Sequence, residues 1–223
     1  MGVDPVACTR FCEQPDLPAV GGTKNPDVEA IIRLAPDLVA VNDEENRVED
    51  AEALGDAGLR VHSMSPRSVA DVGPAVVALG DAIGADVPAV FAAPDWDRWL
   101  EEQRASAASP RRRSAVLVWR RPWMTTNADT YGSSLLELLG VDNVFAGEQE
   151  RYPEVALEEI TVRRTDLVLL PDEPYPFKAR HVEELEAAVD DAAVRLVDGR
   201  DLFWWGVRTP AALARLRDAL RRW

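Results

Sequence analysis

The order of apolar and polar residues predicts short strands that alternate with helices. Apolar, β-favouring runs occupy 38–41, 59–64, 115–119, 167–170 and 194–197. Runs of this length are typical of strands buried on both faces. Apolar residues at helical spacing predict helices over 26–35, 48–54, 68–83, 131–139, 179–188 and 210–222. Asn25 is the predicted N-cap of the first of these helices. This alternation predicts an α/β protein with two Rossmann-like lobes, each built on a parallel sheet.

A longer helical stretch separates the two halves of the pattern. Residues 87–108 carry Trp96, Trp99 and Leu100 at helical spacing, although Pro94 is expected to kink or restart the helix. We expect a single long rigid helix here. The predicted organisation is therefore a first lobe over 1–86, a linking helix over 87–110 and a second lobe over 111–223.

A weak internal repeat supports two similar lobes. Residues 28–45 align with 157–174 at an offset of 129 residues, and the aligned pairs Asp37/Asp166, Leu38/Leu167 and Val39/Val168 are identical. In each copy a predicted helix leads into an Asp-Leu-Val strand that ends in an acidic loop. Facing lobes would bring these loops to opposite walls of one cleft, whereas the alternative is chance similarity between α/β units.

The charge of the chain excludes several classes of partner. A formal net charge of −14 repels phosphate backbones and anionic lipid headgroups, so we expect no nucleic-acid partner. The basic run at 111–113 precedes an apolar strand and is interpreted as a solvated loop. No apolar stretch approaches the ~18 residues that span a bilayer, and the first residues lack the pattern of an export signal.

Aromatic residues gather in the segments that follow the predicted strands. Ligands collect at the carboxyl ends of open parallel sheets, and here these segments are 42–46, 120–131, 171–181 and 199–208. Prolines stiffen them, and stiff aromatic walls suit a large planar ligand. We expect Trp123 and Trp204 to provide stacking surfaces for it. The alternative is that Trp119, Phe203 and one of the following tryptophans fold back into the core.

The residues that could support catalysis are few. The chain has no G-x-S-x-G, P-loop, G-x-G-x-x-G or H-E-x-x-H motif, and its only histidines are His62 and His181. His62 is interpreted as a structural strand residue, whereas helix entry and a polar ligand contact both remain open for His181. Cys8 and Cys12 have a spacing that suits a helix face or a local disulfide. Without a nearby histidine cluster they predict no metal site.

Long segments of the chain match a known family. The stretches are GVDPVACTRFCEQP (2–15), GGTKNPDVEAIIRLAPDLV (21–39), WRRPWMTTNADTYGSSLLELLGVDNVFA (119–146), TDLVLLPDEPYPFKARH (165–181) and DLFWWGVRTPAAL (201–213). In collinear order and over nearly the whole chain, they resemble the substrate-binding proteins of ABC importers for cobalamin and iron-siderophore complexes. This group is known as the helical-backbone metal receptors, a class of periplasmic binding protein, and the second stretch is the most specific match.

The resemblance implies a ligand site between two lobes and no catalytic residue. By position, the ligand-binding residues would be Arg10, Phe11, Asn42, Glu44, Asn46, Trp119, Trp123, Met124, Tyr175, Phe177, Trp204 and Trp205. Trp204 would match an aromatic residue that packs on the corrin in the cobalamin binder. The loop at 42–46 is more acidic than the loop of that binder, which favours a ligand with positive charge or exposed amide donors.

The resemblance also implies partners and a cellular location. The function it implies is capture of a cobalamin-like corrinoid, ferric siderophore or haem-type chelate as transported ligand, without a resident cofactor. Expected partners are a permease, which would meet Glu49 and Glu183, and an ATPase, and we expect a monomer. The alternatives are an intracellular corrinoid or haem carrier without a transporter and an enzyme on a similar two-lobed scaffold.

The amino-terminal lobe departs from the family pattern. Members of the family are extracytoplasmic and have a further strand and helix before the position of Gly2, usually behind an export signal or a lipid-anchor cysteine. We therefore expect the first lobe to lack its first strand and helix in this sequence. A chain that starts at Met1 would stay in the cytoplasm.

Overall fold

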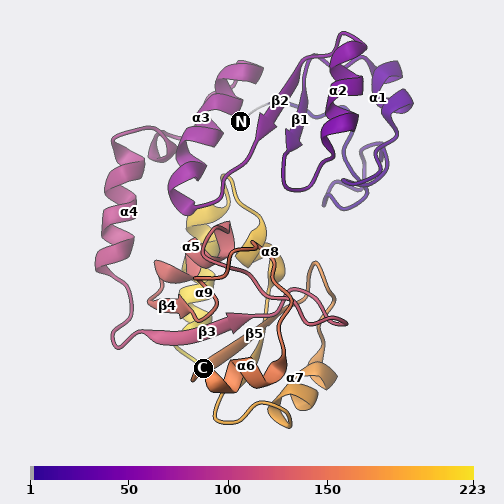
Figure 1. The fold of residues 1–223 in the computed structure, drawn as a ribbon. Helices are drawn as coiled ribbons and strands as arrows, with labels where there is room; N and C mark the ends of the chain where they lie inside the picture. The colour runs from indigo at the N-terminus through magenta and orange to yellow at the C-terminus, as the bar shows by residue number, and fades with distance from the viewer. Residues whose placement is uncertain (1–2) are drawn as a thin grey trace. The chain divides into compact units, whose positions relative to one another are not determined.

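The computed structural model describes residues 3–223, which form two compact units (Figure 1). The first unit comprises Met1–Ser65 and Pro74–Ala92, and the second comprises Pro66–Gly73 and Ala93–Trp223. Met1 and Gly2, where the resemblance places the start of the family pattern, lie outside the described residues.

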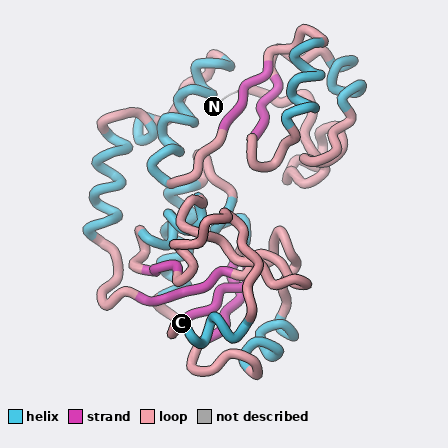
Figure 2. The backbone as a smooth tube through the Cα atoms, viewed as in Figure 1, coloured by secondary structure: helices cyan, strands magenta, loops and turns pink. Residues whose placement is uncertain are grey.

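The first unit contains a parallel pair of strands with helices beside it (Figure 2). Its elements are α1 (Val28–Leu34), β1 (Val39–Asn42), α2 (Val48–Asp56), β2 (Val61–Met64) and the 3-10 turn η1 (Ala89–Phe91). The helix α3 (Val69–Ile83) contributes residues to both units. Helix α1 begins after Asp27, whose side chain accepts a hydrogen bond from the backbone of Ala30. The predicted cap at Asn25 is therefore wrong by two residues.

The second unit is built on a four-stranded parallel sheet in the order β4-β3-β5-β6. Its strands are β3 (Arg112–Val116), β4 (Val141–Asn143), β5 (Leu167–Pro171) and β6 (Ala193–Val197). Its helices are α4 (Asp95–Ala105), α5 (Tyr131–Glu137), α6 (Leu157–Val162), α7 (Ala179–Glu186), α8 (Gly199–Phe203) and α9 (Thr209–Leu220). Helices α6 and α7 cover one face of the sheet, and α5, α8 and α9 lie on the other (Figure 1).

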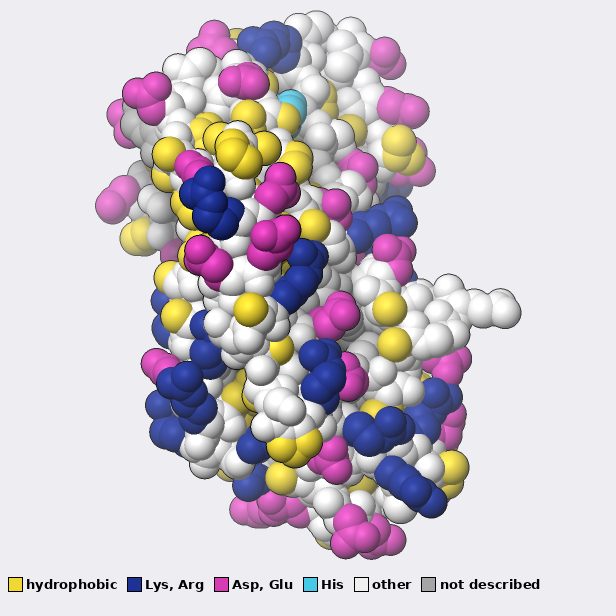
Figure 3. Space-filling view, turned by 90° about the vertical axis from the view of Figure 1, so that its left-hand side faces the viewer, with side chains coloured by type: hydrophobic (Ala, Val, Ile, Leu, Met, Phe, Trp, Pro, Cys, Tyr) yellow, Lys and Arg dark blue, Asp and Glu magenta, His cyan; other side chains and the backbone are white. Residues whose placement is uncertain are grey.

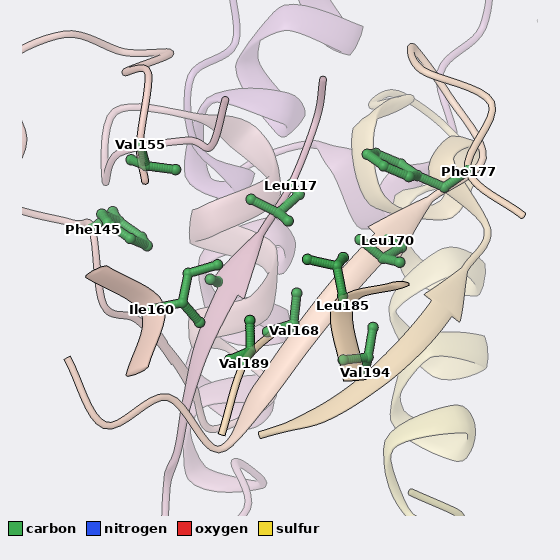
Figure 4. Close-up of a cluster of buried hydrophobic side chains, with 11 residues drawn as sticks. Leu117, Phe145, Val155, Ile160, Val168, Leu170, Phe177, Leu185, Val189 and Val194 are labelled. Atoms are coloured by element: carbon green, nitrogen blue, oxygen red, sulfur yellow. The ribbon is translucent and has the colours of Figure 1, made fainter. Parts of the chain in front are cut away.

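Strand alternation divides the core of the second unit between the two faces of its sheet. Leu117, Val168 and Leu170 point from the sheet toward Ile160 of α6 and Leu185 of α7, and all five are fully buried (Figure 4). Their neighbours along the strands project to the opposite face, because successive side chains of a strand alternate. Every residue of β5 is buried, as the continuous apolar run predicts.

The predicted linking helix over 87–110 is divided in the structure. The turn η1 is followed by Pro94, and α4 begins at Asp95, because a proline cannot donate the backbone hydrogen bond of a helix interior. Helix α4 belongs to the second unit, where the indole of Trp96 donates to the carbonyl oxygen of Ala70 at 3.2 Å. Val69 is also anchored there, because its N–H donates to the hydroxyl of Ser134 at 2.9 Å.

The remaining elements follow the predicted order with shifted ends. Strand β3 spans 112–116 instead of 115–119, so Trp119 lies beyond it in a loop. Strand β4 and helix α8 were not expected from the periodicity. Both copies of the repeat form a helix followed by a strand, α1 with β1 and α6 with β5, as predicted. Among residues 3–223, no helix is both long enough and apolar enough to cross a membrane.

Candidate functional site

The loops that follow β3, β5 and β6 lie at the same edge of the sheet in the second unit. The three strands are parallel neighbours, so their carboxyl ends point the same way. The loop after β3 reverses at Trp119 and Met124, which pair as an antiparallel bridge. This geometry brings sequence-distant aromatic residues together at the edge where open α/β sheets bind ligands.

Trp119 is the exposed ring of this aromatic cluster, and the half-buried Tyr175 lies against it. Trp119 is 43% exposed, and its ring meets Tyr175 edge to face with centroids 5.5 Å apart. The guanidinium of Arg120 lies 5.6 Å from the ring centre of Trp123. Aromatic surface with a cation at its border can stack on a planar ligand and pair with an anionic substituent.

Phe177 is buried behind that surface, contrary to the prediction that it lines the site. It is 3% exposed, belongs to the core cluster of the sheet and stacks on Trp123 with centroids 6.2 Å apart. Tyr175 lies at 4.7 Å from it on the outer side. Trp123 and Met124 are half-buried, and Trp123 packs against the core. These side chains pack behind the pair formed by Trp119 and Tyr175.

His181 performs the helix-entry role at this cluster. Its Nδ1 accepts a hydrogen bond from the backbone of Lys178 at 2.9 Å, and its side chain is buried. Burial lowers the pKa of His181, and the charges of Arg180 and Arg120 lower it further, while Glu184 opposes them. The neutral imidazole can therefore accept the Lys178 hydrogen bond, as the start of α7 requires.

An ion pair fixes Arg120 beside the aromatic rings. Its guanidinium donates to Glu184 at 2.7 Å, and this hydrogen bond lowers the pKa of the Glu184 carboxyl. The Nε atom of Arg120 is buried and has no hydrogen-bond partner among residues 3–223. One donor of this guanidinium is thus unsatisfied in the described structure.

The loop after β6 brings Trp204 and Trp205 to the same edge of the sheet, and both are half-buried. The guanidinium of Arg208 lies 5.6 Å from the ring centre of Trp204. Burial raises the pKa of the neighbouring Glu173 carboxyl, and a hydrogen bond with Trp204 partly opposes that increase.

This loop is tied to the loop after β5. The N–H of Gly199 donates to the side chain of Asp172 at 2.8 Å. A Cβ atom at Gly199 would lie 2.9 Å from the backbone of Glu173, closer than side chains tolerate. Only glycine therefore fits where the two loops meet.

The predicted polar residues of the first unit stabilise their own loop. The side chain of Asn46 accepts from the backbone of Asn42 at 2.8 Å, and that of Asn42 accepts from the backbone of Glu44 at 3.1 Å. Asn46 also donates to the carbonyl of Thr23 at 3.0 Å, and Lys24 donates to the carbonyl of Glu44 at 2.7 Å. The two amides are thus engaged within the loop, and Glu44 is half-buried.

Arg10 and Phe11 lie exposed in a turn of the first unit. The guanidinium of Arg10 lies 5.0 Å from the ring centre of Phe11, which is 57% exposed. Gly22 provides the space for both, because a Cβ atom there would lie 3.2 Å from Arg10 and 3.3 Å from Phe11. This turn presents one cation and one ring to solvent.

A hollow of about 500 Å³ in the first unit was missed by sequence reasoning. Its lining residues are Val41, Asp43, Asn46, Arg47, Val48, Ala51, Glu52 and Ser63. The only signal in the sequence is Val48, an apolar residue that remains 64% exposed on the first turn of α2. The hydroxyl of Ser63 donates to Asp43 at its rim.

The two predicted docking carboxylates are exposed. Glu49 lies in the first turn of α2 and is paired with Arg47 at 3.4 Å, while Glu183 lies on α7. No group of three or more potential metal ligands is found within the part of the chain that the structure describes. In the lower part of Figure 3, Lys and Arg side chains are interspersed with carboxylates over the second unit.

Comparisons with known proteins point to one family. The sequence model described as "Periplasmic binding protein" matches residues 4–192. A vitamin B12-binding protein of Vibrio vulnificus is 24% identical over 164 residues, which are 71% of this chain and 60% of that protein. The corresponding protein of Vibrio cholerae is 22% identical over 168 residues, 73% of this chain and 61% of its own length. The aligned part thus spans about 60% of the length of these curated relatives.

Solved structures of similar proteins share the fold. The periplasmic vitamin B12 binding protein of Vibrio cholerae has a TM-score of 0.75 at 21% identity and covers 97% of this chain and 88% of its own. The periplasmic heme binding protein of the same organism has a TM-score of 0.76 at 16% identity, with coverages of 96% and 90%. Identities this low establish the fold alone.

Proposed function

Because the chain belongs to the periplasmic binding protein family, we propose that it is the ligand-capturing component of an ABC importer. The transported ligand would be a planar metal chelate of the corrinoid or haem type, or a ferric siderophore. The named relatives are binding proteins for vitamin B12 and heme, and none is an enzyme. A permease and an ATPase would be its partners, and it would act as a monomer on the extracytoplasmic side, where the family is found.

The pair formed by the exposed Trp119 and the half-buried Tyr175 carries this proposal. An exposed tryptophan held edge to face against a tyrosine loses little side-chain entropy when a flat ligand stacks on it. Arg120 adds a cation that can pair with a carboxylate on the ligand, such as a haem propionate. Trp204 supplies a second ring from the adjoining loop.

Titration with haemin and with cyanocobalamin tests the proposal. Quenching of tryptophan fluorescence should saturate with at least one of the two. Trp119→Ala and Trp204→Ala should each weaken that binding by about 5- to 150-fold, as stacking worth about 1 to 3 kcal/mol implies by analogy with rings that stack on nucleobases. If neither ligand nor a ferric siderophore binds the intact protein, the proposal is wrong.

Trp99→Ala is the matched control. It removes the same ring from α4, where Trp99 stacks on Trp96 at 4.6 Å instead of standing in a strand-end loop. We expect it to change stability and to leave the dissociation constant unaltered. If Trp99→Ala and Trp119→Ala lose the same affinity, the loss comes from a general disturbance of the fold and not from a ligand contact of Trp119.

The transport role is tested separately from ligand binding. Glu49→Arg and Glu183→Arg each reverse an exposed charge near the places where, by the family resemblance, acidic residues would meet arginines of the permease. We expect both variants to bind ligand normally and to support less uptake by cells that carry the cognate transporter. Uptake that needs no such transporter would instead favour a carrier role.

A further inference from the structure

We propose that Cys8 and Cys12 form an intramolecular disulfide that locks the turn presenting Arg10 and Phe11. The chain contains two cysteines, and in the structure both are free thiols. The disulfide would be a covalent modification of the first unit, formed with a small-molecule disulfide as oxidant. Its formation is independent of what the protein binds.

The backbone brings the two cysteines together. Cys8 is held by hydrogen bonds from its N–H to the carbonyl of Pro18 at 3.1 Å and from the N–H of Val20 to its own carbonyl at 2.9 Å. The N–H of Cys12 donates to the carbonyl of Thr9 at 3.1 Å, which closes a tight turn. The chain therefore reverses in a tight turn directly after the anchored Cys8.

The two thiol groups interact in the reduced protein. The Sγ of Cys12 lies 3.5 Å from the hydroxyl of Thr9. Burial raises the pKa of the Cys8 thiol, and the charge of Cys12 and a hydrogen bond with its thiol raise the pKa further. A disulfide requires Cα atoms about 4.4–6.8 Å apart, and a tight turn between two cysteines is the local geometry that can provide this separation.

The exposure of the two sulfurs sets the order of the reaction. Cys12 is exposed and Cys8 is partly buried. The Cys12 thiolate attacks one sulfur of oxidised glutathione, forming a mixed disulfide and releasing one glutathione thiolate, which takes up a proton. The Cys8 thiolate then attacks the sulfur of Cys12 and releases the second glutathione. The protein loses two electrons and two protons, and the oxidant becomes two thiols.

The bridge would stiffen a turn that the family resemblance assigns to the ligand site, and this part of the inference rests on the proposed function. Arg10 and Phe11 are the third and fourth residues of the five-residue ring from Cys8 to Cys12. Their side chains already pack over Gly22. Because a preorganised contact loses less entropy on binding, the oxidised protein should bind haemin about 2- to 10-fold more tightly than the reduced protein.

Mass spectrometry tests the bridge directly. The intact protein is equilibrated with graded ratios of oxidised to reduced glutathione, and free thiols are then blocked with N-ethylmaleimide. Under oxidising conditions we expect a monomer that takes up no maleimide and no glutathione. Persistence of two blocked thiols, or accumulation of a glutathione adduct or a disulfide-linked dimer, would overturn the proposal.

Cys8→Ser and Cys12→Ser are matched controls, because each leaves one thiol without a resolving partner. Both should accumulate a stable glutathione adduct under the conditions that close the bridge in the unaltered chain. Closure in the unaltered chain should become faster as pH rises, because the raised pKa of Cys8 keeps it protonated near neutral pH. A closure rate that does not change with pH would contradict the resolving role of Cys8.

Limited proteolysis reports the locked turn without any ligand. Trypsin should cut the Arg10–Phe11 bond several-fold more slowly in the oxidised protein, while cleavage after the exposed Lys24 should be unchanged. Equal cleavage at Arg10 in both forms would show that the bridge does not lock the turn.

If the bridge forms and slows cleavage but neither haemin nor cyanocobalamin binds, only the proposed function fails. Binding that is equal in both redox states removes the effect on affinity alone.

Discussion

Strand β5 of the second unit has two strand neighbours, whereas β1 of the first unit has one neighbour within the described chain. The two strands are the aligned halves of the internal repeat and share the Asp-Leu-Val sequence. Leu167 and Val168 are fully buried, but their counterparts Leu38 and Val39 are only half-buried. The same local pattern thus acquires different burial from the number of layers and strands packed around it.

The units also differ in charge and in buried polar groups. The first has 15 acidic and 5 basic residues, and the second has 24 acidic and 20 basic residues. Every buried polar or charged side chain identified between residues 3 and 223 lies in the second unit. Asp201, for example, accepts from Arg208 at 2.9 Å and from Arg215 at 2.6 Å. A thick core can bury such a charge only with its partners in place.

The largest expected contrast comes from truncating the aligned leucines. Leu167→Ala should lower the free energy of unfolding by about 2 to 5 kcal/mol, because it leaves a cavity in a closed core. Leu38→Ala removes the same atoms from a half-buried site and should cost about 1 kcal/mol. Urea unfolding of both variants measures the difference, and equal losses would break the comparison between the units.

Removal of the buried carboxylate should have the next largest effect. Asp201→Ala deprives two guanidinium groups of their acceptor and should lower the free energy of unfolding by about 1.5 to 3 kcal/mol. Its partners are partly exposed, so water compensates for part of the loss. Asp201→Asn keeps one acceptor and should cost less. If urea unfolding shows that both variants lose less than about 0.5 kcal/mol of unfolding free energy, Asp201 has no structural role.

The helix cap of the first unit provides a smaller effect. Asp27→Ala removes the acceptor for the N–H of Ala30 at the start of α1 and should cost about 1 kcal/mol. Asn25→Ala, at the position that the sequence favoured as cap, should be nearly neutral. Thermal unfolding of the two variants decides between the residues, and a larger loss for Asn25→Ala would return the cap to the predicted position.

The smallest effect is a pH dependence that involves one histidine. The pKa of His181 is lowered in the folded protein by burial and by Arg180 and Arg120, so the unfolded chain binds the proton more readily. The associated stability is fully present above about pH 6.5, the ordinary histidine value, and is lost as pH falls through the folded pKa. His181→Gln should flatten this part of the curve of unfolding free energy against pH.

His62→Gln is the control for that measurement. His62 lies on β2 of the first unit, and its Nε2 is buried without a hydrogen-bond partner in the described chain. If the pH profile of stability changes with His62→Gln and not with His181→Gln, the pH dependence arises in the first unit and the prediction for His181 is wrong. An unchanged profile in both would remove His181 from the account of acid sensitivity.

The sequence was sufficient for the elements whose periodicity comes from burial. Strand β5 is a continuous apolar run because both of its faces are covered, and α3 shows the helical spacing expected of it. Strand β4 was missed because it has three residues and two of them are polar. The side chain of Asn143 donates a hydrogen bond to the carbonyl of Thr126 at 2.7 Å. A polar residue in this role does not contribute to the apolar pattern that predicts a strand.

The candidate site was harder to predict because loop residues have no periodicity. Tyr175 and Phe177 stand in the same proline-rich loop, yet one ring faces outward and the other enters the core. The local amino-acid sequence does not distinguish the two residues. Likewise, Asn42 and Asn46 have the composition of ligand contacts, but their amides are used to hold the loop. The sequence predicted that aromatic and amide side chains stand in these loops, but it did not predict which groups they contact.

The contact at Gly199 restricts how this edge of the sheet can diversify among related sequences. A side chain at this position would collide with the backbone of Glu173, so the loops after β5 and β6 cannot drift apart independently. Insertions are therefore best tolerated in the loop after β3. Variation in length among related sequences should accumulate in that loop, while Gly199 should stay unchanged.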